Sequence, residues 1–190
     1  MSIATGRDPE ALTLLQNPPE SVQIAIPCIC CLEALSVLEQ EEKSRKIFEQ
    51  ELDLQINRAQ RNVISPTAQS ILFHLRQVRD DNQTLIGETE EHLFQAFNHQ
   101  IASQVELIAL TGEMLQSSVS RTIIEDRTDN LILHCILGHA REHPRSGKVF
   151  LSGNVKDFGT PKVREALSQA GVSDYFSRTQ DFIGWLQSQT

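Results

Sequence analysis

The sequence predicts an α/β fold, in which a parallel sheet is flanked by helices and interrupted by a helical insertion over about residues 43–120. Short apolar strand patterns alternate with helical patterns in the first 42 residues and again after residue 120. The stretch between them has only two glycines, Gly87 and Gly112, and its apolar residues recur at helical spacing. A chain of 190 residues can bury one sizeable core, so we expect a single domain over residues 1–190.

The first 42 residues predict a helix, a strand and a second helix. Asp8 and Pro9 are typical of a helix N-terminus, and the Asn-Pro-Pro sequence at 17–19 ends that helix. Residues 22–26 are rich in β-branched side chains and stop at Pro27, which indicates a strand. From residue 28 to about 42 the apolar residues form a helical stripe.

The insertion should consist of several helices. Ser65 and Pro66 predict a helix N-terminus, and the polar run at 80–82 predicts a break. These helices would form a layer on one side of the sheet; the alternative is a projecting arm that makes a homodimer.

The last 70 residues return to alternating elements. A helix should begin at Thr128 and Asp129 and end before Pro144, and residues 148–152 should form a buried strand. After a polar loop, a helix over residues 161–170 is closed by Gly171. A short segment and a final helix with a capping box at residues 177–180 complete the chain.

Composition excludes several classes of function. The formal net charge of -8 argues against a broad basic surface that coats nucleic acid, although residues after 140 carry seven basic against five acidic side chains. An aromatic content of 5% is too low for base-stacking platforms. No apolar run reaches the roughly 18–20 residues that span a bilayer, and no signal peptide is apparent, so we expect a cytoplasmic protein without membrane contact.

Cysteines and histidines give weak signals. Three of the four cysteines cluster at residues 28–31 in an apolar stretch, which is typical of reduced core thiols; a soft-metal site is the alternative. His134, His139 and His143 are spaced so that they do not share one helical face. We therefore expect surface or core histidines.

Three carboxylates lie where open α/β sheets bind ligands, at or after the ends of strands. Glu33 follows the first strand among apolar neighbours, Asp129 lies in the first turn of a helix, and Asp157 follows the second strand. The alternative explanations are a solvated surface position for Glu33, stabilisation by the helix dipole for Asp129 and a turn-forming role for Asp157. Converging carboxylates would instead supply hard oxygen ligands for Mg²⁺ or Mn²⁺.

The segments RTDNLILHCIL and KVFLSGNVKDF resemble the second half of a PIN domain, and VQIAIPCICCLEAL resembles the strand and helix that carry this family's Glu. The resemblance covers roughly residues 1–42 and 120–188. It implies a metal-dependent nuclease with a PIN-like parallel sheet. The family's opening strand, which carries the first Asp of the site, has no counterpart in this sequence.

By matching position, the resemblance makes Glu33, Asp129 and Asp157 the catalytic, metal-binding carboxylates. Ser152 would orient them, and Asn154 occupies a loop position that the family often fills with Asp. The implied activity is Mg²⁺- or Mn²⁺-dependent endonucleolytic cleavage of RNA, or alternatively of DNA. A catalytically inactive PIN-like binding module, in a toxin-antitoxin or RNA-associated complex with an antitoxin or another protein partner, is the second hypothesis. A helical scaffold is the third.

Overall fold

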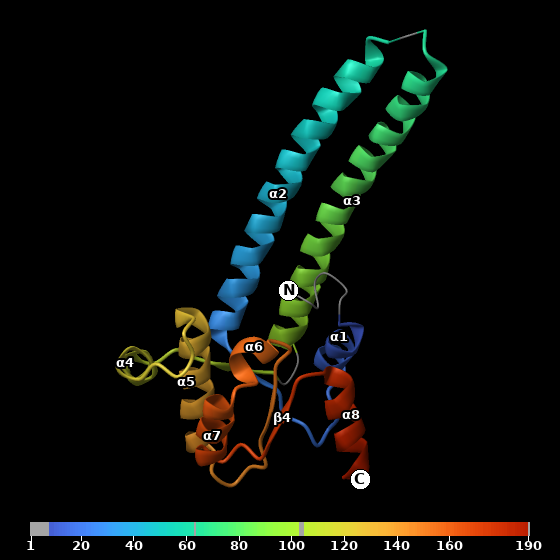
Figure 1. Cartoon of the computed structure of the whole chain (residues 1–190). Helices are drawn as coiled ribbons and strands as arrows, with labels where there is room; N and C mark the ends of the chain where they lie inside the picture. Colours follow the sequence, from blue (N-terminus) through green and yellow to red (C-terminus); the bar gives the residue numbers. More distant parts are fainter. Residues whose placement is uncertain (1–7, 63, 103–104, 190) are drawn as a thin grey trace. The chain divides into compact units, whose positions relative to one another are not determined.

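A computed structural model describes residues 8–62, 64–102 and 105–189 of the chain (Figure 1). The chain divides into two compact units: one is built on Glu33–His99, and the other joins Asp8–Leu32 to Gln100–Thr190. The expectation of a single domain over residues 1–190 stays a prediction. In the part of the chain that is described, no helix combines the length and the apolar character needed to cross a membrane.

The unit built on Glu33–His99 is a hairpin of two long helices, α2 (Cys28–Gln60) and α3 (Pro66–Ala102). Helix α3 begins at Pro66 as predicted, and the Ser65 hydroxyl accepts a hydrogen bond from the backbone N–H of Ala68 at 3.3 Å. Buried aliphatic side chains come from both helices. They are Leu52, Ile56, Leu93 and Ala96.

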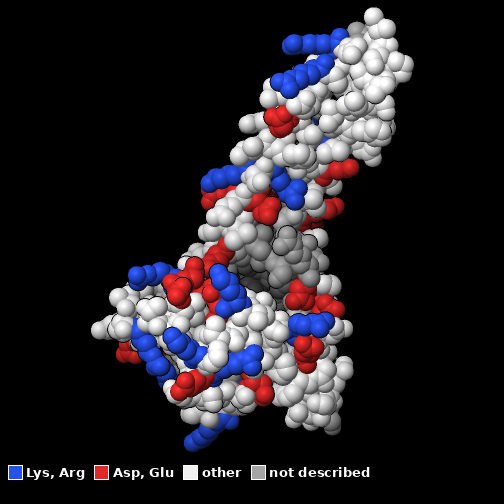
Figure 2. All heavy atoms as spheres, in the orientation of Figure 1, with Lys and Arg blue, Asp and Glu red and all other residues white. Residues whose placement is uncertain are grey.

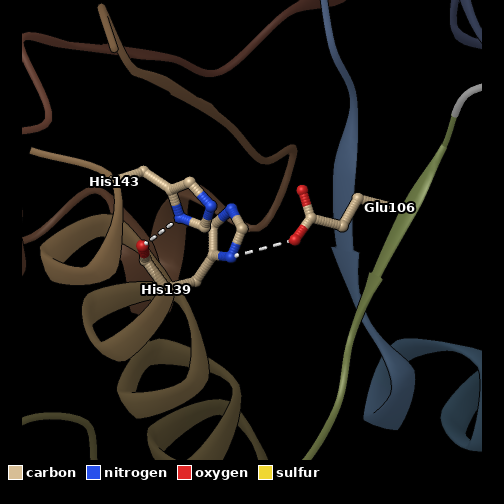
Figure 3. Close-up of side chains that lie close together, drawn as sticks. All are labelled: Glu106, His139 and His143. Carbon is tan, nitrogen blue, oxygen red and sulfur yellow. Dashed lines mark hydrogen bonds and ion pairs between the residues drawn. The ribbon is translucent and has the colours of Figure 1, made fainter. Parts of the chain in front are cut away.

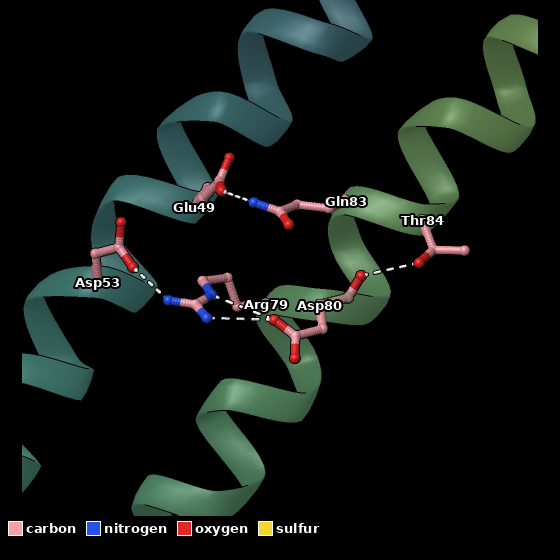
Figure 4. A network of polar contacts seen from close by, with 6 residues as sticks. All are labelled: Glu49, Asp53, Arg79, Asp80, Gln83 and Thr84. Carbon is pink, nitrogen blue, oxygen red and sulfur yellow. Dashed lines mark hydrogen bonds and ion pairs between the residues drawn. The ribbon is translucent and has the colours of Figure 1, made fainter.

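Polar pairs between the two helices explain why the predicted break at residues 80–82 is wrong. From the pair of Glu49 and Gln83 to the pair of Asp53 and Arg79, the residue number rises on α2 and falls on α3, so the helices run antiparallel (Figure 4). The polar run therefore lies inside a continuous helix, and its residue Asn82 contributes to the hairpin contact. The pairs are Arg45 with Asn82 (3.1 Å), Glu49 with Gln83, and Asp53 with Arg79 (3.5 Å).

The hairpin also exposes large apolar side chains, among them Ile47, Phe48, Leu54, Phe73 and Phe94. A solvent-facing helix normally keeps such residues on its packed stripe. The homodimerisation arm anticipated from the sequence is compatible with these side chains and stays a prediction.

The other unit holds the remaining helices, and α1 (Pro9–Gln16) starts as the sequence predicts. Asp8 is its N-cap and accepts a hydrogen bond from the backbone N–H of Ala11 at 2.9 Å. The further helices are α4 (Gly112–Ser120), α5 (Arg127–Glu142), α6 (Val155–Phe158), α7 (Pro161–Gln169) and α8 (Thr179–Ser188). Gly171, with φ of 86°, follows α7 in the left-handed conformation that glycine adopts readily.

The start of α8 differs from the predicted capping box at residues 177–180. Its N-cap is Arg178, whose side chain makes no capping hydrogen bond. The Thr179 hydroxyl instead donates to Asp8 Oδ2 at 2.8 Å, so one carboxylate caps α1 and also ties the start of α8 to it.

The predicted α/β fold with a PIN-like parallel sheet is wrong. The described residues form four strands of three residues each, paired as two separate parallel ladders. Strand β1 (Ala25–Pro27) pairs with β2 (Glu106–Ile108), and β3 (Val149–Leu151) pairs with β4 (Asp174–Phe176). The molecule is therefore mostly helical.

Local sequence explains why the strands stay short. Pro27 has no N–H for a ladder, and α2 begins at the next residue. The second predicted strand stops at Leu151, because Asn154 already caps α6. Strand β2 lies within the stretch expected to be wholly helical; there Thr111 caps α4 by accepting from the Met114 N–H at 3.2 Å, which confines the helix to the residues after it.

Helix α5 supplies the centre of the core in place of a sheet. Its side chains Leu133, Cys135 and Leu137 are at most 1% exposed, and they pack in one cluster with residues of α4, α7 and both ladders. At Gly138 a Cβ atom would lie only 2.8 Å from the Met114 Cε, so glycine leaves room for the Met114 side chain of α4. Both ends of α5 carry titratable side chains.

Candidate functional site

Two of the predicted carboxylates converge at the N-terminal end of α5. Asp129 lies in the first turn of α5, and Asp157 lies in α6, three residues after the N-cap Asn154. The Asp157 carboxylate is close enough to that of Asp129 for its negative charge to raise the pKa of Asp129. Two segments that are separate in the sequence thus bring their carboxylates together.

Asn154 links the two segments. Its side-chain Nδ2 donates to Asp129 Oδ2 at 3.0 Å, and its Oδ1 accepts from the backbone N–H of Asp157 at 3.3 Å. The Ser152 hydroxyl accepts from the Asn154 backbone N–H at 3.3 Å. Through these bonds Ser152 is linked to Asp129 by way of Asn154, whose side-chain amide contacts the Asp129 carboxylate.

Electrostatics at this site favour a cation. Burial raises the pKa of the Asp129 carboxyl, and the negative charges of Asp157 and Asp126 raise it further, whereas the hydrogen bond from Asn154 opposes the shift. Asp126 is the N-cap of α5 and accepts from the backbone N–H groups of Thr128 and Asp129 at 2.9 and 3.0 Å. A divalent ion between the carboxylates would relieve this repulsion.

Asn130 supports the site from inside the unit. It is 3% exposed and makes four hydrogen bonds to backbone groups, three in the segment that joins α4 to α5 and one at Ser118 near the end of α4. His134 contacts the same segment through its Nε2, 2.9 Å from the Arg121 carbonyl oxygen. The loop that leads into Asp126 and Asp129 is therefore held onto α5.

Glu33 lies on α2, in the hairpin unit, and its side chain is half-buried. Its assignment to the same site as Asp129 and Asp157 stays a prediction.

A second cluster, which the sequence did not reveal, is formed by Glu106, His139 and His143 (Figure 3). One ligand atom from each side chain lies within 4.8 Å of the other two. His139 and His143 are four residues apart at the C-terminal end of α5, and Glu106 comes from β2. In the sequence, the signal that could have indicated this cluster is the His-x-x-x-His spacing of His139 and His143. This signal is obscured because His134 does not lie on the same helix face as the other two histidines. In addition, the apolar residues around Glu106 recur at helical spacing, which hides the strand.

Charged side chains do not form a single-sign surface on the face that Figure 2 shows. Lys and Arg are interspersed there with Asp and Glu. Phosphate contacts by this face would therefore depend on local groups and bound ions rather than on a broad basic patch.

Comparison of the chain with protein-family models, with curated proteins and with solved structures finds no match.

Proposed function

We propose that this chain is a Mg²⁺- or Mn²⁺-dependent endoribonuclease, in which Asp129 and Asp157 hold the ion. The observation that carries this proposal is the proximity of the two carboxylates at the first turn of α5, where Asn154 is hydrogen-bonded to the Asp129 carboxylate and to the Asp157 backbone N–H. The resemblance of the segments around both residues to PIN-domain motifs supports the same chemistry, although the fold differs from the one that the resemblance implies.

The donor set fits a hard divalent cation. Carboxylate oxygens are the ligands that Mg²⁺ and Mn²⁺ prefer, and Mg²⁺ usually binds through one or two carboxylates with water completing its shell. When bound, the ion would lower the pKa of an attacking water and offset charge on the phosphate. Asp129 and Asp157 would hold it, and Asn154 would keep Asp129 in the binding orientation.

A matched set of variants tests the proposal. Mg²⁺ and Mn²⁺ binding to the full chain is measured by titration calorimetry, and cleavage of a generic single-stranded RNA is followed in parallel, with single-stranded DNA as a second substrate. Asp129→Asn and Asp157→Asn should each lose binding and cleavage. Asp181→Asn is the control, because Asp181 is an exposed aspartate in the first turn of α8, the position that Asp129 has in α5.

Binding that survives in both site variants would overturn the proposal. A folded wild-type chain that neither binds metal nor cleaves RNA would favour the inactive binding module. Glu33→Gln tests the predicted third ligand, because its loss of metal affinity should approach that of Asp129→Asn if the assignment is right.

A further inference from the structure

The opposite end of α5 carries a second group of metal ligands. Glu106, His139 and His143 offer one carboxylate oxygen and two imidazole nitrogens, all within 4.8 Å of one another. From Asp129 to His139 and His143 the helix advances ten and fourteen residues, or about 15–21 Å at 1.5 Å per residue. This group is therefore separate from the carboxylate pair and does not depend on the proposed nuclease function.

Rigid elements position these ligands. Residues four apart on a helix lie on the same face, so the rings of His139 and His143 lie side by side, with centroids 4.3 Å apart. Glu106 lies in β2, where it is paired in register with Ala25 of β1. Because β2 and α5 share one hydrophobic core, the carboxylate and the imidazoles belong to a single packed unit.

Hydrogen bonds leave a ligand atom available on two of the three side chains. Glu106 Oε2 accepts from Gln23 Nε2 at 3.1 Å, while Oε1 faces His139 Nδ1 at 3.6 Å. His143 Nδ1 lies 3.0 Å from the His139 carbonyl oxygen, which can only accept, so Nδ1 carries the proton and Nε2 keeps its lone pair. Outer partners of this kind orient the ligands of metal sites.

The combination of two imidazoles and one carboxylate selects the metal. Three such ligands and one open position are typical of catalytic Zn²⁺ sites, whereas Mg²⁺ prefers oxygen ligands throughout. Zn–N and Zn–O bonds of about 2.0–2.2 Å in a tetrahedron place ligand atoms about 3.3–3.6 Å apart. The Glu106 and His139 atoms at 3.6 Å are already near this spacing.

An ion could reach this site from solvent. The His139 side chain is 17% exposed and that of Glu106 is 36% exposed, and His143 is exposed. Glu106 also borders an open hollow of about 600 Å³, lined by residues 20–23, Val105 and Glu106. We propose that Glu106, His139 and His143 form a Zn²⁺ site that joins β2 to the C-terminal end of α5.

Cysteine thiolates are the rival zinc ligands in this chain. Burial raises the pKa of Cys135 to about 11 and raises that of Cys31, so both thiols hold their protons at neutral pH. Among the residues that the structure describes, no cysteine belongs to a group of three gathered ligands.

Zinc titration of the untagged full chain tests the proposal. We expect one Zn²⁺ per chain, with affinity reduced about tenfold or more in His143→Gln and in Glu106→Gln. His92→Gln is the matched control, because His92 is an exposed histidine on α3. Asp129→Asn should bind Zn²⁺ as the wild type does, which separates this site from the carboxylate pair.

Two results would overturn the assignment. One is a folded wild-type chain that binds no Zn²⁺; the other is unchanged affinity in both His143→Gln and Glu106→Gln, each verified as folded by circular dichroism. Co²⁺ substitution adds a spectroscopic readout, since a sulfur-to-cobalt charge-transfer band would place the ion on cysteines instead and refute the site.

Discussion

Replacing Asn130 with alanine removes four hydrogen bonds that tie the end of α4 and the segment after it to α5. Asn130 Oδ1 accepts from the backbone N–H groups of Ile123 and Ile124 at 2.9 and 3.1 Å. Its Nδ2 donates to the carbonyl oxygens of Ser118 and Arg121 at 2.9 and 3.2 Å. The bonds to Ile124 and Ser118 are buried, so water cannot replace the lost amide there without opening the structure.

These two buried bonds determine the size of the effect. A buried backbone group left without a partner costs about 1–3 kcal/mol, so Asn130→Ala should lower the free energy of unfolding by about 2–6 kcal/mol. In a chain of this size, that loss lowers Tm by roughly 4–24 °C. The two partly buried bonds add little, because their partners can be hydrated.

Trp185 allows the unfolding of this unit to be followed by itself. It is the only tryptophan, and it lies in α8 with its ring stacked 6.0 Å from that of Phe182. Urea unfolding followed by tryptophan fluorescence therefore reports the unit that contains Asn130. Asn17→Ala, at an exposed asparagine of the same unit, is the control and should change stability by less than about 0.5 kcal/mol. A loss below about 1 kcal/mol in Asn130→Ala would refute the reasoning.

Three further predictions concern the charge, packing and reactivity of the same unit. The raised pKa of Asp129 means that the metal-free chain loses stability as pH rises from the ordinary Asp pKa through the raised one. Asp157→Asn removes one of the negative charges that repel Asp129, so it should raise the free energy of unfolding at pH 7 by about 0.2–1 kcal/mol. Urea titrations with a chelator present should show that this gain in stability vanishes below the ordinary Asp pKa of about 3.9, where the carboxyl groups are protonated. Gly138→Ala should be nearly neutral in thermal unfolding because the flexible Met114 side chain can move, whereas Gly138→Leu should cost about 1–3 kcal/mol; equal effects would contradict this packing. Cys135, fully buried and with its pKa raised to about 11, should resist iodoacetamide at pH 7 until the unit unfolds, as mass spectrometry of the labelled chain can establish.

Local signals in the sequence identified individual elements but not their pairing. Asp8, Pro66 and Gly171 mark the ends of helices because capping and proline geometry depend on a few adjacent residues. Which strands pair depends on residues far apart, such as Ala25 and Glu106, and no local pattern encodes that contact. For this reason the alternating pattern predicts a single sheet, whereas two short ladders form.

The two candidate sites also differ in whether local sequence signals could indicate them. Asp129 and Asp157 could be anticipated as neighbours because each lies where a strand or helix directs it to one end of the fold. Glu106 could not be joined to His139 and His143 without knowing that β2 exists. Its short strand is hidden within apolar spacing that is equally typical of a helix.

Helix α5 gives its two ends opposite electrostatic character. Its aligned peptide dipoles place about half a positive charge at the end that carries Asp129 and about half a negative charge at the end that carries His139 and His143. The field of the helix therefore opposes a cation at the first end and attracts one at the second, each by about 0.3–1 kcal/mol. An ion held by Asp129 and Asp157 should accordingly exchange more readily, whereas an ion at the histidine end should have the longer residence time.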